Sequence, residues 1–255
     1  MNKRLIAERF AKARGTYSRE ARVQHQVAEK MMRLVQTYAA DPARPFRHVV
    51  EFGCGTGSYS DILLRTLHPD CLLLNDLCPE MKECVDALTV PRGTTLSFLP
   101  GDAEVLDFPE ETDLITSCST LQWFSEPAAF FRRCHRFLRS GGILAFTTFG
   151  PRNMHEIRAL TGNGLDYLPM DEVQRLLLPH FSLLHATQET VPLAFATPTD
   201  VLRHLQQTGV TGTEKRIWTR TRLHDFCDRY TQLFGRDDGT VTLTYQPIYI
   251  IAKKL

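Results

Sequence analysis

The strongest constraint on the fold is an alternation between residues 48 and 149, in which short apolar segments are followed by longer segments of mixed polarity. Apolar segments without a polar residue at every second position predict strands that are buried on both faces of a sheet. Right-handed crossovers then place helices on both faces. We therefore predict an α/β fold with a doubly wound, mostly parallel, seven-stranded sheet. The predicted strands of this part are 48–53, 71–76, 96–101, 113–119 and 143–149, with helices near 58–67, 79–88 and 127–139.

The segments on either side of this alternation are predicted to be additions to the same domain. A short helix broken at Gly15 precedes a longer helix that begins at Ser18, whose apolar residues recur at spacings of three and four. After residue 150 the pattern changes to helices around one strand at 182–194. The predicted parts of the single domain are an N-terminal helical arm at 1–45, a core at 46–150, a helical cap with one strand at 151–235, and a final strand at 236–255 that can pair antiparallel.

Composition and local patterns exclude several classes of protein. Charged residues at 23% and hydrophobic residues at 43% of the 255-residue chain are typical of globular proteins. No apolar run approaches the roughly 18 residues of a membrane span, and the first residues lack the apolar stretch of a secretory signal, so we expect a cytoplasmic protein with no membrane partner. The seven cysteines include no C-x-x-C pair, which predicts free thiols, and the nine histidines form no H-x-x-x-H pair, so we expect no metal.

A glycine-rich turn, EFGCGTGSYSD, lies between the first predicted strand and its helix. A triphosphate-binding loop needs a lysine after its last glycine, whereas Gly57 is followed by Ser58. A dinucleotide-binding loop needs glycine or alanine where Ser58 stands. The spacing here is G-x-G-x-G instead, at Gly53, Gly55 and Gly57. Neither phosphate-binding loop therefore fits this turn.

The acidic residue Glu51 stands two positions before the first of these glycines. A carboxylate at the tip of a strand would repel a pyrophosphate, but it suits a ligand that carries an ammonium or a sulfonium charge. S-adenosylmethionine carries both and has no phosphate, and its carboxylate can bind the free N–H groups at the start of the following helix. Glycine at positions 53 and 55 lets the backbone approach the ligand closely. We therefore predict S-adenosylmethionine as co-substrate, with S-adenosylhomocysteine as product.

Polar and apolar residues after the next two predicted strands complete the expected site. Asp76 ends the second strand, where its carboxylate can accept hydrogen bonds from both ribose hydroxyls. Leu77 and Met81 would flank the adenine. Asp102 follows the third strand and can accept from the adenine amino group, with Ala103 beside it. Because ligands of doubly wound sheets bind at the carboxyl ends of the strands, residues 46–150 are predicted to be the cofactor-binding core.

These segments resemble a known family. VVEFGCGTGSYSDILL, NDLCPEM, GDAEVLDF and the stretch from SCSTLQWF to LAFTTFG look like the successive motifs of class I S-adenosylmethionine-dependent methyltransferases. The arm RFAKARGTYSREARVQHQVA, the LQWF segment and the ending LTYQPIYIIAKK resemble, more narrowly, the malonyl-acyl-carrier-protein O-methyltransferases of biotin synthesis. This resemblance covers nearly the whole chain. It implies methylation of the free carboxylate of a malonyl group on acyl carrier protein, and it leaves the substrate residues of the cap undefined.

A carboxylate acceptor is already ionised near pH 7, so this reaction requires positioning rather than a general base. Tyr17 in the arm can fold over the cofactor, and Gln24 can contact its methionine end. Ser119, Gln122 and Trp123 follow the fourth predicted strand and are expected to border the methyl group. An aromatic face there would favour the sulfonium by about 0.5–2 kcal/mol.

The distribution of charge suggests where an acidic carrier could dock. Residues 1–48 contain eleven Lys or Arg and four Asp or Glu, whereas the whole chain has a net charge of only +1. Three arginines, Arg132, Arg136 and Arg139, are also expected on one face of the helix at 127–139, because their spacings are four and three. The arm has few interleaved aromatic residues, so we expect no nucleic acid partner.

Two other readings of the sequence stay open at this point. One is a methyltransferase of the same fold that acts on a small acid, such as an aconitate-type tricarboxylate. The other is a regulatory protein that binds S-adenosylmethionine without turnover. The second is disfavoured by LQWF, because a protein that only binds the cofactor has no need of that aromatic segment.

Overall fold

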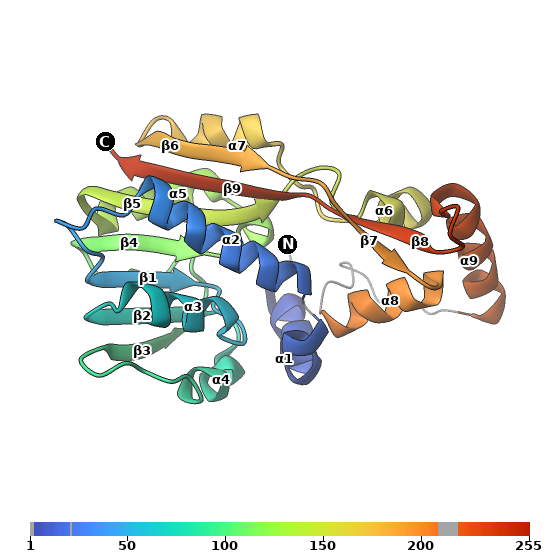
Figure 1. Ribbon diagram of the computed structural model, residues 1–255, viewed down its shortest axis with the longest axis horizontal. Helices are drawn as coiled ribbons and strands as arrows, with labels where there is room; N and C mark the ends of the chain where they lie inside the picture. Colours follow the sequence, from blue (N-terminus) through green and yellow to red (C-terminus); the bar gives the residue numbers. More distant parts are fainter. Residues whose placement is uncertain (1–2, 21, 209–218) are drawn as a thin grey trace.

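The computed structural model describes residues 3–20, 22–208 and 219–255, without the side chains of 13, 14 and 16–20. A seven-stranded sheet with the order β3-β2-β1-β4-β5-β9-β6 forms its centre (Figure 1). Strands β1 to β5 are parallel to one another, and β9 pairs antiparallel with both β5 and β6. The predicted doubly wound, mostly parallel fold is confirmed. The strands of this sheet are β1 His48–Phe52, β2 Cys71–Asp76, β3 Thr95–Pro100, β4 Thr112–Ser117, β5 Leu138–Phe149, β6 Phe181–Gln188 and β9 Pro247–Lys254.

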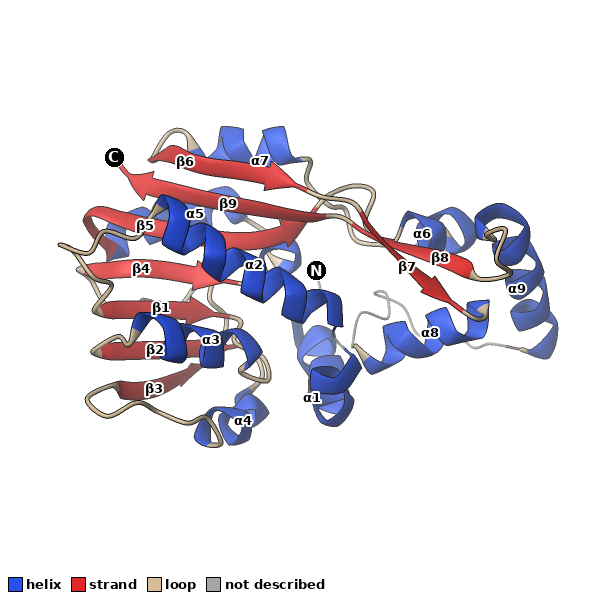
Figure 2. Ribbon diagram, in the orientation of Figure 1, coloured by secondary structure: helices blue, strands red, loops and turns tan. Residues whose placement is uncertain are grey.

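Helices cover both faces of the sheet (Figure 2). One face packs on α2 and α3, and the other on α5 and α7 (Figure 1). Consecutive residues of one strand enter different cores: Val49 lies in the core under α2 and α3, whereas Val50 lies in the core under α5. This explains why the strands are apolar at nearly every position. The helices are α1 Lys3–Glu20, α2 Arg22–Tyr38, α3 Ser58–Leu67, α4 Lys82–Asp86, α5 Pro127–Phe137, α6 His155–Thr161, α7 Met170–Leu177, α8 Pro198–Gln207 and α9 Arg220–Phe234, with 3-10 turns η1 Pro79–Met81 and η2 Leu121–Trp123.

The N-terminal arm differs from the expectation at Gly15. Helix α1 is continuous from Lys3 to Glu20 and passes through this glycine. A glycine costs about 1 kcal/mol in a helix interior, which the surrounding good helix formers and tertiary contacts can offset. Residue 21, between the end of α1 and the start of α2, lies outside the described residues.

The segments expected as single strands at 182–194 and 236–255 are each divided. Strands β7 Val191–Phe195 and β8 Val241–Tyr245 form a second, two-stranded antiparallel sheet beside α6, α8 and α9 (Figure 1). The break between β8 and β9 falls at Gln246, whose backbone N–H donates to Asn153 and whose side-chain oxygen accepts from the N–H of Arg152. Pro247, which follows, has no N–H to donate. Hydrogen bonds to the chain beyond β5 thus replace the sheet ladder at this point.

Of the three arginines expected on one helix face, Arg132 and Arg136 lie on α5 and Arg139 does not. Helix α5 ends at Phe137, so Arg139 lies in β5. Its guanidinium forms an ion pair with Asp113, whose other carboxylate oxygen accepts from the backbone N–H groups of Arg47 and His48. Arg139 therefore joins β5 to β4 and the start of β1.

Among the described helices, none is long and apolar enough to cross a membrane.

Candidate functional site

A pocket opens at the carboxyl ends of β1, β2 and β4, between these strand ends and helices α1 and α2. Its lining brings together ten of the eleven residues predicted to bind the cofactor. They are Gln24, Glu51, Gly53, Gly55, Asp76, Leu77, Met81, Asp102, Ala103 and Ser119. The loops that carry them lie far apart in the sequence and meet because parallel strands end at the same edge of a sheet.

The other predicted site residues are placed differently. Trp123 lines the pocket, whereas Gly57 and Gln122 are not part of the described lining. Gly57 instead begins α3 in a left-handed conformation. Tyr17 lies within α1, but its side chain is outside the described part of the chain.

The first two glycines of the turn have different reasons to lack a side chain. Gly53 has φ +67°, and a Cβ atom built there would meet Oγ1 of Thr120 at 2.2 Å. Gly55 has φ +53°, and a Cβ atom there would meet nothing within 4 Å. Because Gly55 lines the pocket, its missing side chain leaves room for a ligand against the backbone. Glycine at 53 thus allows the loop to pack against Thr120, and glycine at 55 allows a ligand to approach the backbone.

Glu51 is buried at the base of the pocket, with an exposed fraction of 1%. The hydroxyl of Ser60, in the first turn of α3, donates to its Oε2 at 2.6 Å. Burial raises the pKa of Glu51 to about 8, the bond from Ser60 opposes this, and the nearby Asp76 adds to it. The carboxyl is therefore poised to ionise when a cation enters the pocket.

Asp76 links the second strand to the glycine turn. Its Oδ2 accepts from the backbone N–H of Gly55, and its Oδ1 accepts from the N–H of Cys78, both at 2.8 Å. Burial raises the pKa of Asp76, and these two N–H groups oppose that shift. The neighbouring Asn75 donates to the carbonyls of Leu99 and Gly101 and so ties the third loop to the second.

The segment after β4 is held in an unusual conformation at Ser119, which has φ +60°. Its N–H donates to Oγ1 of Thr147, and its carbonyl accepts from Nε2 of Gln122 at 2.7 Å. The Ser119 hydroxyl is buried in the pocket lining without a hydrogen-bond partner, as is the side-chain oxygen of Gln24. Backbone strain of this kind gathers at functional sites, and the two unpaired groups fit a polar ligand. Gln122, expected to border the methyl group, instead donates to the backbone carbonyl of Ser119.

One face of α1 forms a wall of the pocket that the sequence analysis missed. Lys3, Ile6 and Phe10 line the pocket, and the ring of Phe10 meets Trp123 edge-on with centroids 5.5 Å apart. Their spacing of three and four is that of one helix face, which is the signal that could have identified them. The arm thus contributes to the pocket through its first turns.

A metal site is not formed by the described side chains, since no three or more His, Cys, Asp or Glu are grouped to hold an ion. The residues present suit an organic cation instead. Open backbone at Gly55, a buried acid at Glu51, and unpaired polar atoms on Gln24 and Ser119 fit the predicted S-adenosylmethionine.

Comparison with known proteins also indicates a methyltransferase. Residues 50–146 match the family model described as a methyltransferase domain. A malonyl-[acyl-carrier protein] O-methyltransferase of Bacteroides helcogenes is 63% identical, with 99% of each chain covered. One from Bacteroides thetaiotaomicron is 53% identical, covering 100% of this chain and 99% of the relative. The solved N-methyltransferase NodS of Bradyrhizobium japonicum, in complex with S-adenosylhomocysteine, is similar in fold, with a TM-score of 0.53 at 12% identity over 94% of this chain and 98% of its own.

Proposed function

Since the chain belongs to the malonyl-[acyl-carrier protein] O-methyltransferase family, we propose that it methylates the free carboxylate of a malonyl group carried by acyl carrier protein. The product is the methyl ester of the malonyl thioester. In biotin synthesis, where the family acts, this ester would serve as the primer. The observation that carries the cofactor assignment is the buried Glu51 beside the open backbone of Gly55. A carboxylate there suits a ligand with an ammonium and a sulfonium charge and would repel a phosphate.

Different residues of the pocket would bind different parts of the cofactor. Glu51 would bind the ammonium of the methionine part, Asp76 the ribose hydroxyls and Asp102 the adenine amino group, with Leu77 and Met81 on the adenine faces. The first turn of α3 presents backbone N–H groups that suit the cofactor carboxylate. When bound, S-adenosylmethionine supplies an electrophilic methyl group, and the proposed mechanism uses no metal.

The acceptor needs position and a dry environment more than it needs a base. Its carboxylate is ionised at neutral pH because its pKa is near 4. Trp123 and Phe10 form an apolar corner of the pocket, and the Ser119 hydroxyl is free to donate to an acceptor oxygen. Holding the nucleophile in line with the methyl group can supply much of the rate enhancement.

The free thiols support a reducing compartment as the place of this reaction. All seven cysteines lie in described parts of the chain and none forms a disulfide. Proteins of oxidising compartments tend to pair their cysteines, so we propose a cytoplasmic location.

The proposed reaction predicts a methyl ester as product. Incubation with malonyl-acyl carrier protein and S-adenosylmethionine should add one methyl group that mild alkali removes. Acidification from pH 7 toward 4 should slow the reaction because the acceptor becomes protonated. Mass spectrometry of the carrier before and after alkali measures this. A methyl group on nitrogen or carbon, or turnover with small acids such as tricarboxylates but not with the carrier, would contradict the proposal.

Of the two basic surfaces considered for carrier docking, the N-terminal arm and α5, we propose that the carrier docks on the arm, at α1. Arg136 forms an ion pair with Asp107 at 2.5 Å, and Arg139 is held by Asp113. Because α5 connects two parallel strands, its last turn lies toward the amino ends of the strands, away from the pocket. Helix α1 borders the pocket, and its exposed residues include Arg4 and Lys12.

Charge reversal should separate these two surfaces. Arg4→Glu/Lys12→Glu should lower kcat/KM for malonyl-acyl carrier protein about 3- to 10-fold and flatten its dependence on salt, because steering between exposed charges is screened over about 8–10 Å. Arg132→Glu/Arg136→Glu is the matched control and should change kcat/KM less than about 2-fold at any salt concentration. Malonyl-pantetheine, which lacks the acidic carrier, should show little salt dependence with any variant. A loss confined to the α5 variant would return the docking surface to that helix.

A further inference from the structure

We propose that Lys3 is a positioning residue for adenine recognition: it bridges Asp102 and Glu104 so that the Asp102 carboxylate faces the amino group of the cofactor's adenine. The inference rests on the proposed function, because it concerns how the same pocket selects its nucleotide part. It assigns a role to a residue at the start of the chain, 99 positions away from the acid that it contacts.

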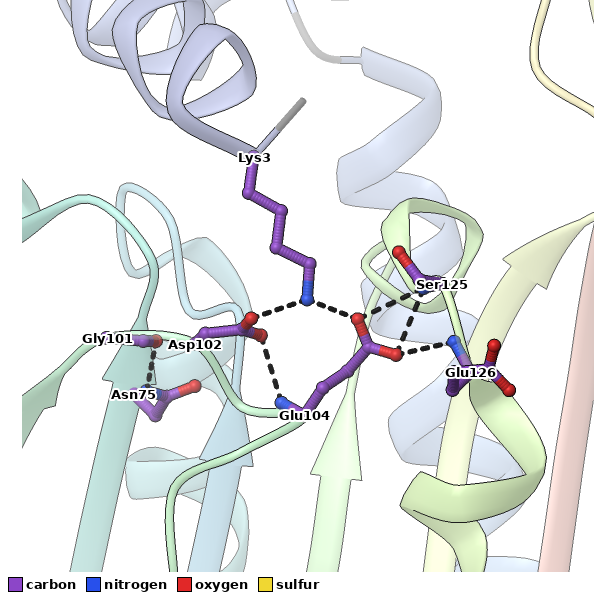
Figure 3. A network of polar contacts seen from close by, with 7 residues as sticks. All are labelled: Lys3, Asn75, Gly101, Asp102, Glu104, Ser125 and Glu126. Atoms are coloured by element: carbon purple, nitrogen blue, oxygen red, sulfur yellow. Dashed lines mark hydrogen bonds and ion pairs between the residues drawn. The ribbon is translucent and has the colours of Figure 1, made fainter. Parts of the chain in front are cut away.

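Lys3 contacts two carboxylates at the adenine end of the pocket (Figure 3). Its Nζ lies 2.5 Å from Oδ2 of Asp102 and also forms an ion pair with Oε2 of Glu104. The other oxygen of Asp102, Oδ1, accepts from the backbone N–H of Glu104 at 3.0 Å. The two acids and the lysine therefore form a closed group in which each member is held by the other two.

Glu104 connects this group to the start of α5. Its carboxylate accepts from the backbone N–H of Ser125 at 3.0 Å and from that of Glu126 at 2.7 Å (Figure 3). Those N–H groups would otherwise have no partner at the helix start. Glu104 is thus fixed from its far side, with a side-chain exposure of 8%, and it offers Lys3 a rigid anchor.

The charge on Lys3 decides which atoms the group can recognise. Without the lysine, Asp102 and Glu104 would place two negative charges close together, and Oδ2 of Asp102 would lose the partner that fixes its orientation. With it, the net charge of the group is −1, and each Asp102 oxygen accepts one bond within the group and keeps a second lone pair for a donor in the pocket that the residue lines. Such an acceptor favours the amino group of adenine and disfavours a carbonyl at the same ring position, because two acceptors would then face each other.

Two residues further along α1 also contact the pocket. Ile6 and Phe10 line the pocket, and Phe10 reaches Trp123, where the methyl group is expected. Seven residues of helix span about 10 Å. Helix α1 therefore fixes Lys3 at one end of the pocket by packing at the other, so the ammonium is delivered to Asp102 by a rigid element.

The test compares two ligands that differ at one ring position. S-adenosylhomocysteine carries the adenine amino group, and S-inosylhomocysteine carries a carbonyl there. Calorimetric titration should show that the wild type binds the adenosyl ligand on the order of 100-fold more tightly. Lys3→Met, which keeps the apolar stem, should reduce this preference to less than about 10-fold, mainly by weakening the adenosyl ligand. Lys3→Arg should retain most of the preference, because it can contact both acids.

Lys82→Met is the matched control, since Lys82 is exposed and forms an ion pair along its own helix, α4, with Asp86. It should leave the affinities for both ligands unchanged, and thermal unfolding of each variant shows that it is folded. Equal weakening of both ligands by Lys3→Met, or an unchanged preference, would overturn the inference and leave the proposed function intact. A wild type that binds neither ligand would instead overturn the proposed function, and the inference with it.

Discussion

Replacing Gly53 by alanine is expected to lower the free energy of unfolding by about 2–5 kcal/mol and the cofactor affinity by more than 100-fold. The new Cβ would lie 2.2 Å from Oγ1 and 2.8 Å from Cβ of Thr120, so a change of side-chain rotamer at Thr120 cannot remove the clash. The positive φ of +67° adds strain for any residue with a Cβ atom. Chemical denaturation and calorimetric titration with S-adenosylhomocysteine measure the two effects.

Gly55→Ala is the matched control within the same turn. It should cost only the strain of a left-handed alanine, about 1–2 kcal/mol of folding free energy, because its Cβ would meet nothing within 4 Å. Its effect on binding should nevertheless be large, since the methyl group would project into the pocket. If Gly53→Ala were as stable as Gly55→Ala, the close approach of Thr120 would not be what requires glycine at 53.

Replacing Glu51 by glutamine is expected to weaken cofactor binding by about 10- to 100-fold, because the ammonium of the ligand loses a charged partner. Burial holds the pKa of Glu51 at about 8 in the cofactor-free protein, so the carboxyl is mostly protonated at pH 7. Binding of a cation should release that proton. The affinity of the wild type should therefore rise between pH 6 and 7, and calorimetry in buffers of different ionisation enthalpy should detect close to one proton released.

The same pKa determines how folding stability depends on pH. A carboxyl whose pKa is raised in the folded state favours the folded state less as the pH rises, starting from its ordinary value of 4.5 and continuing to about 8. Glu51→Gln removes this loss, so the variant should gain stability relative to the cofactor-free wild type between pH 5 and 8. Parallel pH profiles of stability for the two proteins would show that Glu51 is ionised in the folded state.

The parts of the fold that follow one repeated pattern were accessible from the sequence. Strands β1 to β4 have nearly the predicted bounds. Each is a continuous apolar run because its residues enter two cores, and such a run is recognisable without knowing which segments pack against it. The division of the chain at Gln246 was not accessible. It depends on hydrogen bonds to Asn153 and to the N–H of Arg152, and neither partner is near in sequence.

The candidate site shows the same division between local and distant causes. Glu51 and Asp76 were predicted because each ends a recognisable strand. Lys3 was not predicted, because the two acids that it contacts, Asp102 and Glu104, lie about a hundred positions away in the sequence. Arg139 was assigned to a helix face by its spacing alone, and its partner Asp113, on a neighbouring strand, decides its place. Spacing identifies faces of elements, but only tertiary contacts decide which charges are used internally.

The position of β9 has a consequence for the order in which the protein can fold during synthesis. This strand follows the other described strands in the sequence, yet it lies inside the sheet and pairs its Lys253 with Ile143 of β5. The five parallel strands leave the ribosome first, and until β9 arrives one side of β5 is an open edge that can pair with another chain. Strand β6 must also wait, because β9 is its neighbour in the sheet. The nascent protein should therefore be most prone to aggregation, and most in need of a chaperone, after β5 has been made and before β9 is available.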